Sequence, residues 1–226
     1  PLHNAETIEI RYMTAKDEDT LTSASLLKKG IALDRLLQNV IVDKNIKADD
    51  LLVGDKNAVL VATRISGYGP EYPTKVQCAS CGSVTTHEFN LADVEVNDGS
   101  NIDLDENGIF YCNLPKMKLR LGLRLLYGVD EKKLTKVAAR RKKQKLPEAA
   151  MTDQFRAIIA SVNDSTDQKH ISSLIDNMPA QDSRWLRLYY STVIPNMDLN
   201  QEYECSACGI AEEVVIPFTT EFFWPK

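Results

Sequence analysis

The motif Cys-x-x-Cys-Gly occurs twice in this chain, at 78–82 and at 205–209. In each copy a stretch rich in β-branched and aromatic residues leads into the motif, and a similar stretch follows it. Stretches of this composition predict strands, so each copy predicts a β-hairpin with two thiols at its tip. Gly82 and Gly209 suit the tight turn after each second cysteine, because glycine adopts positive φ without strain.

The two motifs together predict one metal site, whose ligands are Cys78, Cys81, Cys205 and Cys208. Structural zinc is usually held by four ligands in a tetrahedron, and each Cys-x-x-Cys pair supplies half of them. A redox pair of the thioredoxin type is disfavoured, because strand-like residues follow both motifs where that type requires a helix. We therefore expect a structural zinc that joins the hairpins into a zinc ribbon. An iron centre of the rubredoxin type is the alternative, since ligand spacing does not fix the metal.

Two other residues with metal-binding side chains are expected to lie outside this site. Cys112, between Tyr111 and Asn113, is predicted to be a small buried hydrophobe. His87 lies in the strand-like stretch after the first motif, and we expect an exposed strand residue there rather than a further ligand.

The part of the chain before the first motif is predicted to be helical. Thr14 and Asp17 have the spacing of a capping box, and Gly30 is a typical C-terminal cap, so one helix is expected between Thr14 and Gly30. Apolar residues recur at helical spacing over 31–41, and the segment 55–67 predicts a third helix.

The chain between the two motifs combines a strand with helices. Alternation predicts a strand over 117–125. Three helices are then expected, over 152–162, 167–177 and 183–192.

These elements predict an α+β fold with three parts. An N-terminal helical region covers residues 1–66, and the hairpins of the zinc ribbon cover 67–91 and 200–226. Residues 92–199 form an insertion that is mainly helical.

A basic segment lies inside the predicted insertion. Residues 132–145 hold eight bases and no acid. The segment is either a solvated helix face or mobile loop, or a binding site for an acidic protein or for nucleic acid. The absence of aromatic residues on which bases could stack is unfavourable for nucleic acid. The residues assigned to partner binding in the second case are Lys132, Lys133, Lys136, Arg140, Arg141, Lys142, Lys143 and Lys145.

The C-terminal segment is apolar and contains Phe222, Phe223 and Trp224. Three large apolar side chains need to be covered, either by their own domain or by a neighbouring subunit. In the second case they are further partner-binding residues.

Bulk properties exclude several classes of function. The formal net charge of -5 gives no general attraction to nucleic acid or to anionic membranes. No apolar run is long enough to span a bilayer and no signal peptide is visible, which predicts a soluble, unsecreted protein. The chain begins at Pro1 without an initiator methionine, so we expect residues to be missing before it. No phosphate loop, nucleophile elbow or metalloprotease motif is present, so no enzyme is predicted.

Several segments resemble the baseplate hub family of T-even-like myophages, including their cyanophage relatives. They are IEIRYMTAKDEDTLTSASLLKKGIALDRLLQNVIVDKNIKADDLLVGDKNAVLVATRISGYGPEY, CASCG, SVNDSTDQKHISSLIDNMPAQDSRWLRLYY, CSACG and IPFTTEFFWP. The resemblance covers nearly the whole chain.

The resemblance implies a structural or hub-assembly protein of a contractile tail, without catalytic activity. Its partners would be other baseplate and tail subunits, with several copies in a symmetric assembly. It would be assembled in the host cytoplasm and be found in the tail baseplate of the virion. Nucleic-acid binding through residues 132–145 is the alternative function, and no membrane role is expected.

Overall fold

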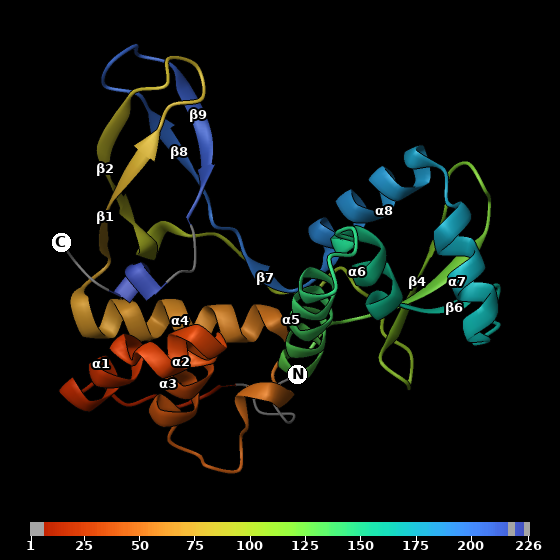
Figure 1. Cartoon of the computed structure of the whole chain (residues 1–226), viewed down its shortest axis with the longest axis horizontal. Coiled ribbons are helices and arrows are strands. Elements are labelled where there is room, and N and C mark those ends of the chain that lie inside the picture. The colour runs from red at the N-terminus through yellow and green to blue at the C-terminus, as the bar shows by residue number, and fades with distance from the viewer. Residues whose placement is uncertain (1–6, 217–219, 224–226) are drawn as a thin grey trace. The chain divides into compact units, whose positions relative to one another are not determined.

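The chain forms two compact units of mixed helix and strand in a computed structural model that describes residues 7–216 and 220–223 (Figure 1). Unit 1 consists of Pro1–Ala48, Gly54–Val96 and Asn196–Lys226. Unit 2 consists of Asp49–Val53 and Asn97–Pro195. The predicted α+β class is confirmed.

Among its described residues, unit 1 has four helices, two hairpins and three short 3-10 turns, of which the first continues from Ala48 into unit 2. The helices are α1 (Ala15–Thr22), α2 (Ala24–Lys29), α3 (Ala32–Val40) and α4 (Val53–Tyr68), and the turns are η1 (Ala48–Asp50), η2 (Leu91–Asp93) and η3 (Thr220–Phe223). The antiparallel hairpins are β1 (Glu71–Gln77) with β2 (Val84–Asn90), and β8 (Asn200–Glu204) with β9 (Ala211–Val215). Two short strands, β3 (Val96–Asn97) and β7 (Asn196–Met197), also pair. Both hairpins were predicted, and they rise from the side of α4 that faces away from α1 to α3 (Figure 1).

The single helix predicted between Thr14 and Gly30 is wrong, because the structure divides it at Ser23. Ser23 is extended, with φ -60° and ψ 108°, and it separates α1 from α2. The hydroxyl of Thr22 donates to the carbonyl of Glu18 at 2.9 Å, and such side-chain bonds compete with the helical backbone. Both predicted caps are present: the Asp17 carboxylate accepts from the Thr14 N–H at 2.9 Å, and Gly30 has φ +67°.

A buried arginine joins three segments of unit 1. Arg64 on α4 is 1% exposed, and its Nε donates to the carbonyl of Phe222 at 3.0 Å. Its two terminal nitrogens donate to the carbonyls of Gly69 at 2.8 Å and Glu71 at 3.0 Å. The rings of Phe222 and Tyr72 lie 5.1 Å apart. Desolvation lowers the pKa of this guanidinium, and the three carbonyls supply the hydrogen bonds that a buried cation requires.

Unit 2 has four helices and a three-stranded antiparallel sheet. The helices are α5 (Gly128–Lys143), α6 (Ala150–Ile158), α7 (Gln168–Asn177) and α8 (Ala180–Val193). The strands are β4 (Ile109–Asn113), β5 (Arg120–Arg124) and β6 (Ile159–Val162), in the order β4-β5-β6. The core includes Phe110, Leu121 and Ile158, together with Cys112, which is buried as predicted.

The helix predicted over 152–162 is also wrong, because α6 ends at Ile158 and the chain continues as β6. Val162 and Ser161 pair with Leu121 and Gly122 on β5. A short apolar run has no periodicity that separates a buried strand from a helix, so pairing with β5 decides the structure.

The predicted helices over 55–67, 167–177 and 183–192 are confirmed as α4, α7 and α8. Among the described residues, no helix combines the length and the apolar character that crossing a bilayer requires.

Candidate metal centre

The two Cys-x-x-Cys loops have the same backbone hydrogen bonds. In the first loop the N–H of Gly82 donates to the carbonyl of Cys78 at 2.9 Å. In the second loop the N–H of Gly209 donates to the carbonyl of Cys205 at 2.8 Å. Gly82 has φ +73° and Gly209 has φ +71°, a conformation that strains other residues. Each loop therefore turns both of its thiols toward the same side.

The structure brings the four predicted cysteines together in one cluster. Their sulfur atoms all lie within 4.8 Å of one another. Cys78 and Cys208 are 3.8 Å apart, as are Cys81 and Cys205. These distances are far longer than a disulfide bond of about 2.0 Å. Such a cluster can bind a metal ion.

The sulfur spacing fits a tetrahedral metal site. A tetrahedron with metal–sulfur bonds of about 2.3 Å has sulfur–sulfur edges of about 3.8 Å. The Cys78–Cys208 and Cys81–Cys205 sulfur pairs, at 3.8 Å, match that edge length. One sulfur of each loop is buried, on Cys78 and Cys205, whereas Cys81 and Cys208 are exposed.

Local hydrogen bonds favour negative charge on some of these sulfurs. The backbone N–H groups of Ala207 and Cys208 lower the pKa of the Cys205 thiol to about 6. The Ser83 hydroxyl and N–H lower the pKa of Cys81. The N–H of Ile210 also lowers the pKa of the Cys208 thiol. Desolvation and the neighbouring cysteines outweigh this hydrogen bond and raise that pKa to about 12. Four thiols this close cannot all ionise unless a cation balances their charge.

Contacts between the hairpins hold the two loops in place. The N–H of Ala79 in the first loop donates to the Glu212 carboxylate on β9 at 3.0 Å. Lower down, the hydroxyls of Thr85 on β2 and Tyr203 on β8 are 2.5 Å apart. Tyr203 is 1% exposed, so this hydrogen bond satisfies a buried hydroxyl.

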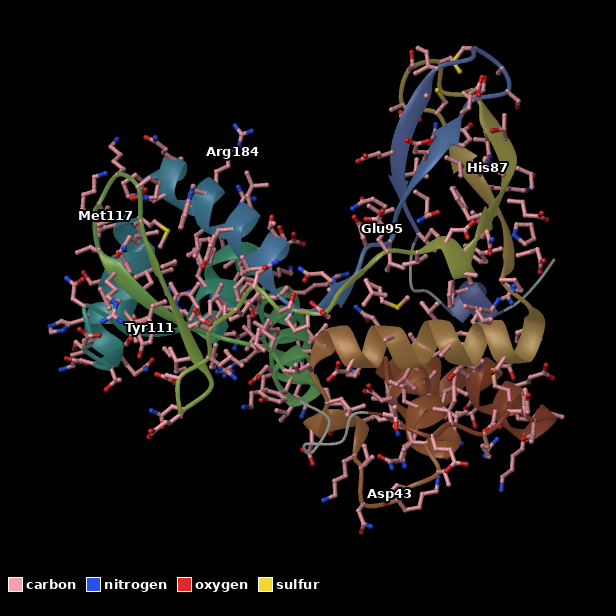
Figure 2. The ribbon with its side chains drawn as sticks, turned by 180° about the vertical axis from the view of Figure 1, so that it is seen from behind. Asp43, His87, Glu95, Tyr111, Met117 and Arg184 are labelled. Atoms are coloured by element: carbon pink, nitrogen blue, oxygen red, sulfur yellow. The ribbon has the colours of Figure 1, made fainter. Side chains whose placement is uncertain are left out.

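His87 lies outside the sulfur cluster, as predicted, but it is half-buried rather than exposed. Its ring packs edge-on against Tyr203, with centroids 5.3 Å apart, and against Phe89 at 4.5 Å. The imidazole is therefore part of the packing between the hairpins, where Figure 2 labels it.

The predicted basic segment lies mostly on α5, where it forms an exposed helix. Acidic Asp130 and Glu131 occupy its first turn and bases its last turn, which is the favourable arrangement for the helix dipole. Ion pairs bind Lys132 to Asp49, and Lys133 to Asp130 at 3.4 Å. Arg141 pairs with Asp153 at 3.1 Å.

Phe222 and Phe223 are buried inside unit 1, with exposed fractions of 0% and 1%. These two side chains are therefore covered by their own domain and not by a neighbouring subunit, and their surface is not free for a partner. Trp224 lies outside the described residues.

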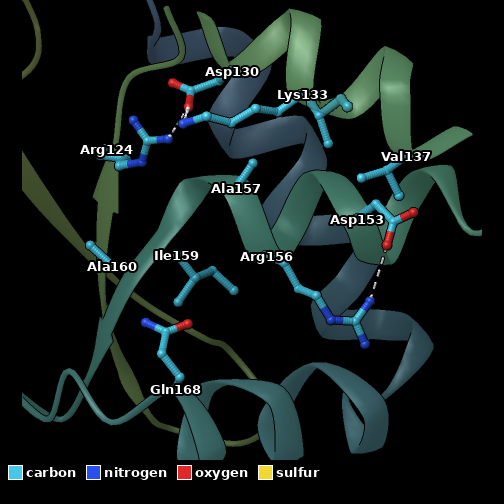
Figure 3. Close-up of a pocket in the computed structure, with 11 residues that line it drawn as sticks. Arg124, Asp130, Lys133, Val137, Asp153, Arg156, Ala157, Ile159, Ala160 and Gln168 are labelled. Atoms are coloured by element: carbon cyan, nitrogen blue, oxygen red, sulfur yellow. Dashed lines mark hydrogen bonds and ion pairs between the residues drawn. The ribbon is translucent and has the colours of Figure 1, made fainter.

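A cavity of about 550 Å³ in unit 2 gathers charged groups between α5, α6 and the sheet (Figure 3). Asp130 accepts from Arg124 at 2.8 Å, and Asp153 from Arg156 at 3.3 Å. The lining contains no histidine, cysteine, serine or threonine. Both of its carboxylates are committed to ion pairs.

Sequence reasoning found the four cysteines but missed the residues that position them. No local pattern pairs Glu212 with Ala79 or Tyr203 with Thr85, because each pair joins positions more than 100 residues apart. The one available signal is the alternation in each hairpin, which indicates that Tyr203 faces inward.

Comparison with known proteins gives a match to one family. The family model described as T4 bacteriophage base plate protein matches residues 2–224. No curated protein and no solved structure matches the chain. Since the family model covers nearly the whole sequence, the chain belongs to the family of T4 bacteriophage base plate proteins.

Proposed function

We propose that this protein is a structural or assembly component of the baseplate hub of a contractile phage tail, without catalytic activity. The observation that carries the proposal is the family match over residues 2–224. The paired carboxylates of the charged cavity agree with a structural role. The protein acts in several copies among other baseplate subunits, after assembly in the host cytoplasm.

Within this role, the four cysteines hold one structural zinc. The sulfur spacing of 3.8 Å supports tetrahedral coordination by Cys78, Cys81, Cys205 and Cys208. Four thiolates leave no open position for water or substrate, so zinc here stabilises the fold by joining the hairpins into a zinc ribbon.

Purified tails test the role directly. Mass spectrometry of tail particles is expected to find this chain in a fixed ratio to the other baseplate subunits. A chain needed for assembly but missing from finished particles would identify an assembly factor. A chain found in neither tails nor assembly intermediates would contradict the proposal.

Metal analysis of the purified protein tests the zinc site. We expect one zinc per chain, and its loss in Cys78→Ser and Cys208→Ser together with a lower melting temperature and failure to enter tails. Cys112→Ser is the matched control and should keep the metal, because Cys112 lies in the core of unit 2. Iron in place of zinc would give a coloured protein, and metal-free wild type with normal incorporation would contradict the site.

The second candidate function is nucleic-acid binding by the basic segment. It is favoured by five bases that have no ion pair among the described residues, namely Lys136, Arg140, Lys142, Lys143 and Lys145. A mobility shift that weakens steeply with salt would support it, because phosphate contacts release counterions.

A further inference from the structure

Helix α5 is covered by its own unit to an unusually small extent. Of its 16 residues, only Gly128 and Asp130 are buried, both in the first turn. Val137 on this helix is 39% exposed, and Leu146 just beyond it is 50% exposed. A surface helix normally buries an apolar stripe, so most of α5 presents surface that the unit itself does not use.

A groove of about 830 Å³ runs between α5, the loop that follows it and α6. Its apolar lining consists of Leu134, Ala138, Ala139, Leu146, Ala149 and Ala150. Most of these side chains are methyl groups, which allow another chain to approach the two helices closely. The groove therefore has a shape and a lining that suit apolar side chains of a partner.

The charged lining of the same groove has more bases than acids, with three bases against Asp153 and Glu148. Arg141, Lys142 and Lys145 line it, and Arg141 is held by Asp153. Lys142 and Lys145 have no ion pair within the part of the chain that the structure describes. An apolar floor next to unpaired cations is complementary to a segment that carries apolar and acidic side chains together.

The adjoining cavity of unit 2 differs from the groove because the charged side chains that line it are paired with one another (Figure 3). There Arg124 and Lys133 share Asp130, and Arg156 pairs with Asp153. Unpaired charge is thus concentrated on the groove and on the exposed side of α5, not in the cavity that Figure 3 shows.

We propose that the groove between α5 and α6 docks an acidic amphipathic helix of a partner protein. Apolar residues of the partner, spaced by three and four, contact Ala138 and Ala139, and its flanking carboxylates pair with Lys142 and Lys145. This inference rests on the proposed role as a baseplate subunit, which requires protein partners. Nucleic acid fits less well, because the groove has no aromatic side chain on which a base could stack.

A labelled model peptide tests the groove in the full-length protein. The probe is a fluorescein-labelled helix of about 18 residues, with leucine at positions spaced by three and four and glutamate elsewhere. Fluorescence anisotropy is expected to show binding that weakens at least about tenfold in Lys142→Glu/Lys145→Glu. Lys28→Glu/Lys29→Glu on α2 makes the same change of charge at two residues that do not line the groove and should leave binding unchanged.

The variant Ala139→Arg separates docking from simple charge attraction. It adds a positive charge but fills the groove, so docking predicts weaker binding, whereas charge attraction alone predicts equal or tighter binding. A second peptide with serine in place of leucine should bind at least about tenfold more weakly. Equal binding of the two peptides, or of wild type and Ala139→Arg, would overturn the proposal.

Two further outcomes would identify a different occupant and overturn the proposal. One is tighter binding of labelled single-stranded DNA than of the acidic peptide, lost in the same double variant. The other is a wild-type dimer in sedimentation that Ala139→Arg converts to a monomer, which would place a second copy in the groove. If the wild-type protein enters tails normally but does not bind the acidic peptide, only the docking proposal is refuted. If it binds the peptide but is absent from tails, only the baseplate role is refuted.

Discussion

Glu212 on β9 accepts a hydrogen bond at 3.0 Å from the backbone N–H of Ala79, 133 positions earlier in the chain. Ala79 lies between the two cysteines of the first loop, so this bond fixes one thiol pair directly to the strand that follows the other. It does so without a metal ion.

Replacing Glu212 should therefore loosen the cluster without removing a sulfur. For Glu212→Ala we expect a loss of about 1 kcal/mol in the free energy of unfolding, the typical net contribution of a hydrogen bond, because this bond is exposed. Urea denaturation measures it. Glu213→Ala is the control, because Glu213 is the exposed neighbour on β9 and should cost almost nothing. Equal effects of the two variants would show that the bond does not contribute.

Arg64→Met should destabilise unit 1 strongly. The substitution keeps most of the side-chain length but leaves the carbonyls of Phe222, Gly69 and Glu71 without their donors. The bond to Phe222 is buried and the other two are partly buried. An unpaired buried acceptor costs about 1 to 3 kcal/mol, so we expect a loss of about 2 kcal/mol or more. Thermal denaturation measures it, with Arg35→Met at an exposed position of α3 as the control. A melting temperature within error of wild type would show that the three carbonyls find other donors.

Acid should remove a contribution that Asp17 makes to stability. Hydrogen bonds from Arg11, at 2.7 and 2.9 Å, and from Thr14 hold the pKa of this carboxyl far below its usual range. A lowered folded-state pKa stabilises the protein above the unfolded-state value of about 3.9, and this stabilisation is lost as the pH falls toward the folded-state pKa.

Asp17→Asn should accordingly destabilise the protein most near neutral pH and progressively less below about pH 4. Urea denaturation over a pH series gives the difference between variant and wild type. Asp19→Asn, exposed on the same helix, is the control and should show a small difference at every pH. A constant difference for Asp17→Asn would mean that its ion pair does not govern the pH dependence.

Cys112 should resist alkylation in the folded protein. It is 8% exposed, and burial raises the pKa of its thiol to about 11, so only about one molecule in a thousand carries the reactive thiolate at pH 8. Mass spectrometry after iodoacetamide treatment should find Cys112 unmodified until unit 2 is unfolded. The exposed Cys81, whose thiol has a lowered pKa, serves as the reactive control in metal-stripped protein. Rapid modification of native Cys112 would contradict its place in the core.

Much of the fold follows from patterns that a few neighbouring residues carry. The hairpins around the cysteines, the caps at Thr14 and Gly30, and the helix that became α4 all depend on local spacing and turn chemistry. The meeting of the four thiols was predictable for a different reason, since a tetrahedral metal site needs two such pairs.

The remaining features depend on contacts between distant segments. Ile159–Val162 becomes a strand because β5 offers it a partner, and a single sequence does not reveal that partner. Arg64 resembles any helical arginine until the chain around Phe222 covers it. The groove beside α5 likewise depends on how α6 packs, whereas the sequence showed only the bases on its rim.

The separation between the paired thiols has a consequence for biosynthesis. Cys78 leaves the ribosome 130 residues before Cys208, which at about 5 to 20 residues per second is a delay on the order of 10 s. Unit 2 is translated almost entirely within that interval and can fold before unit 1 has its last strands. The first pair of sulfurs therefore stays exposed in the nascent chain, open to oxidation or to capture of the wrong ion, until its partners emerge.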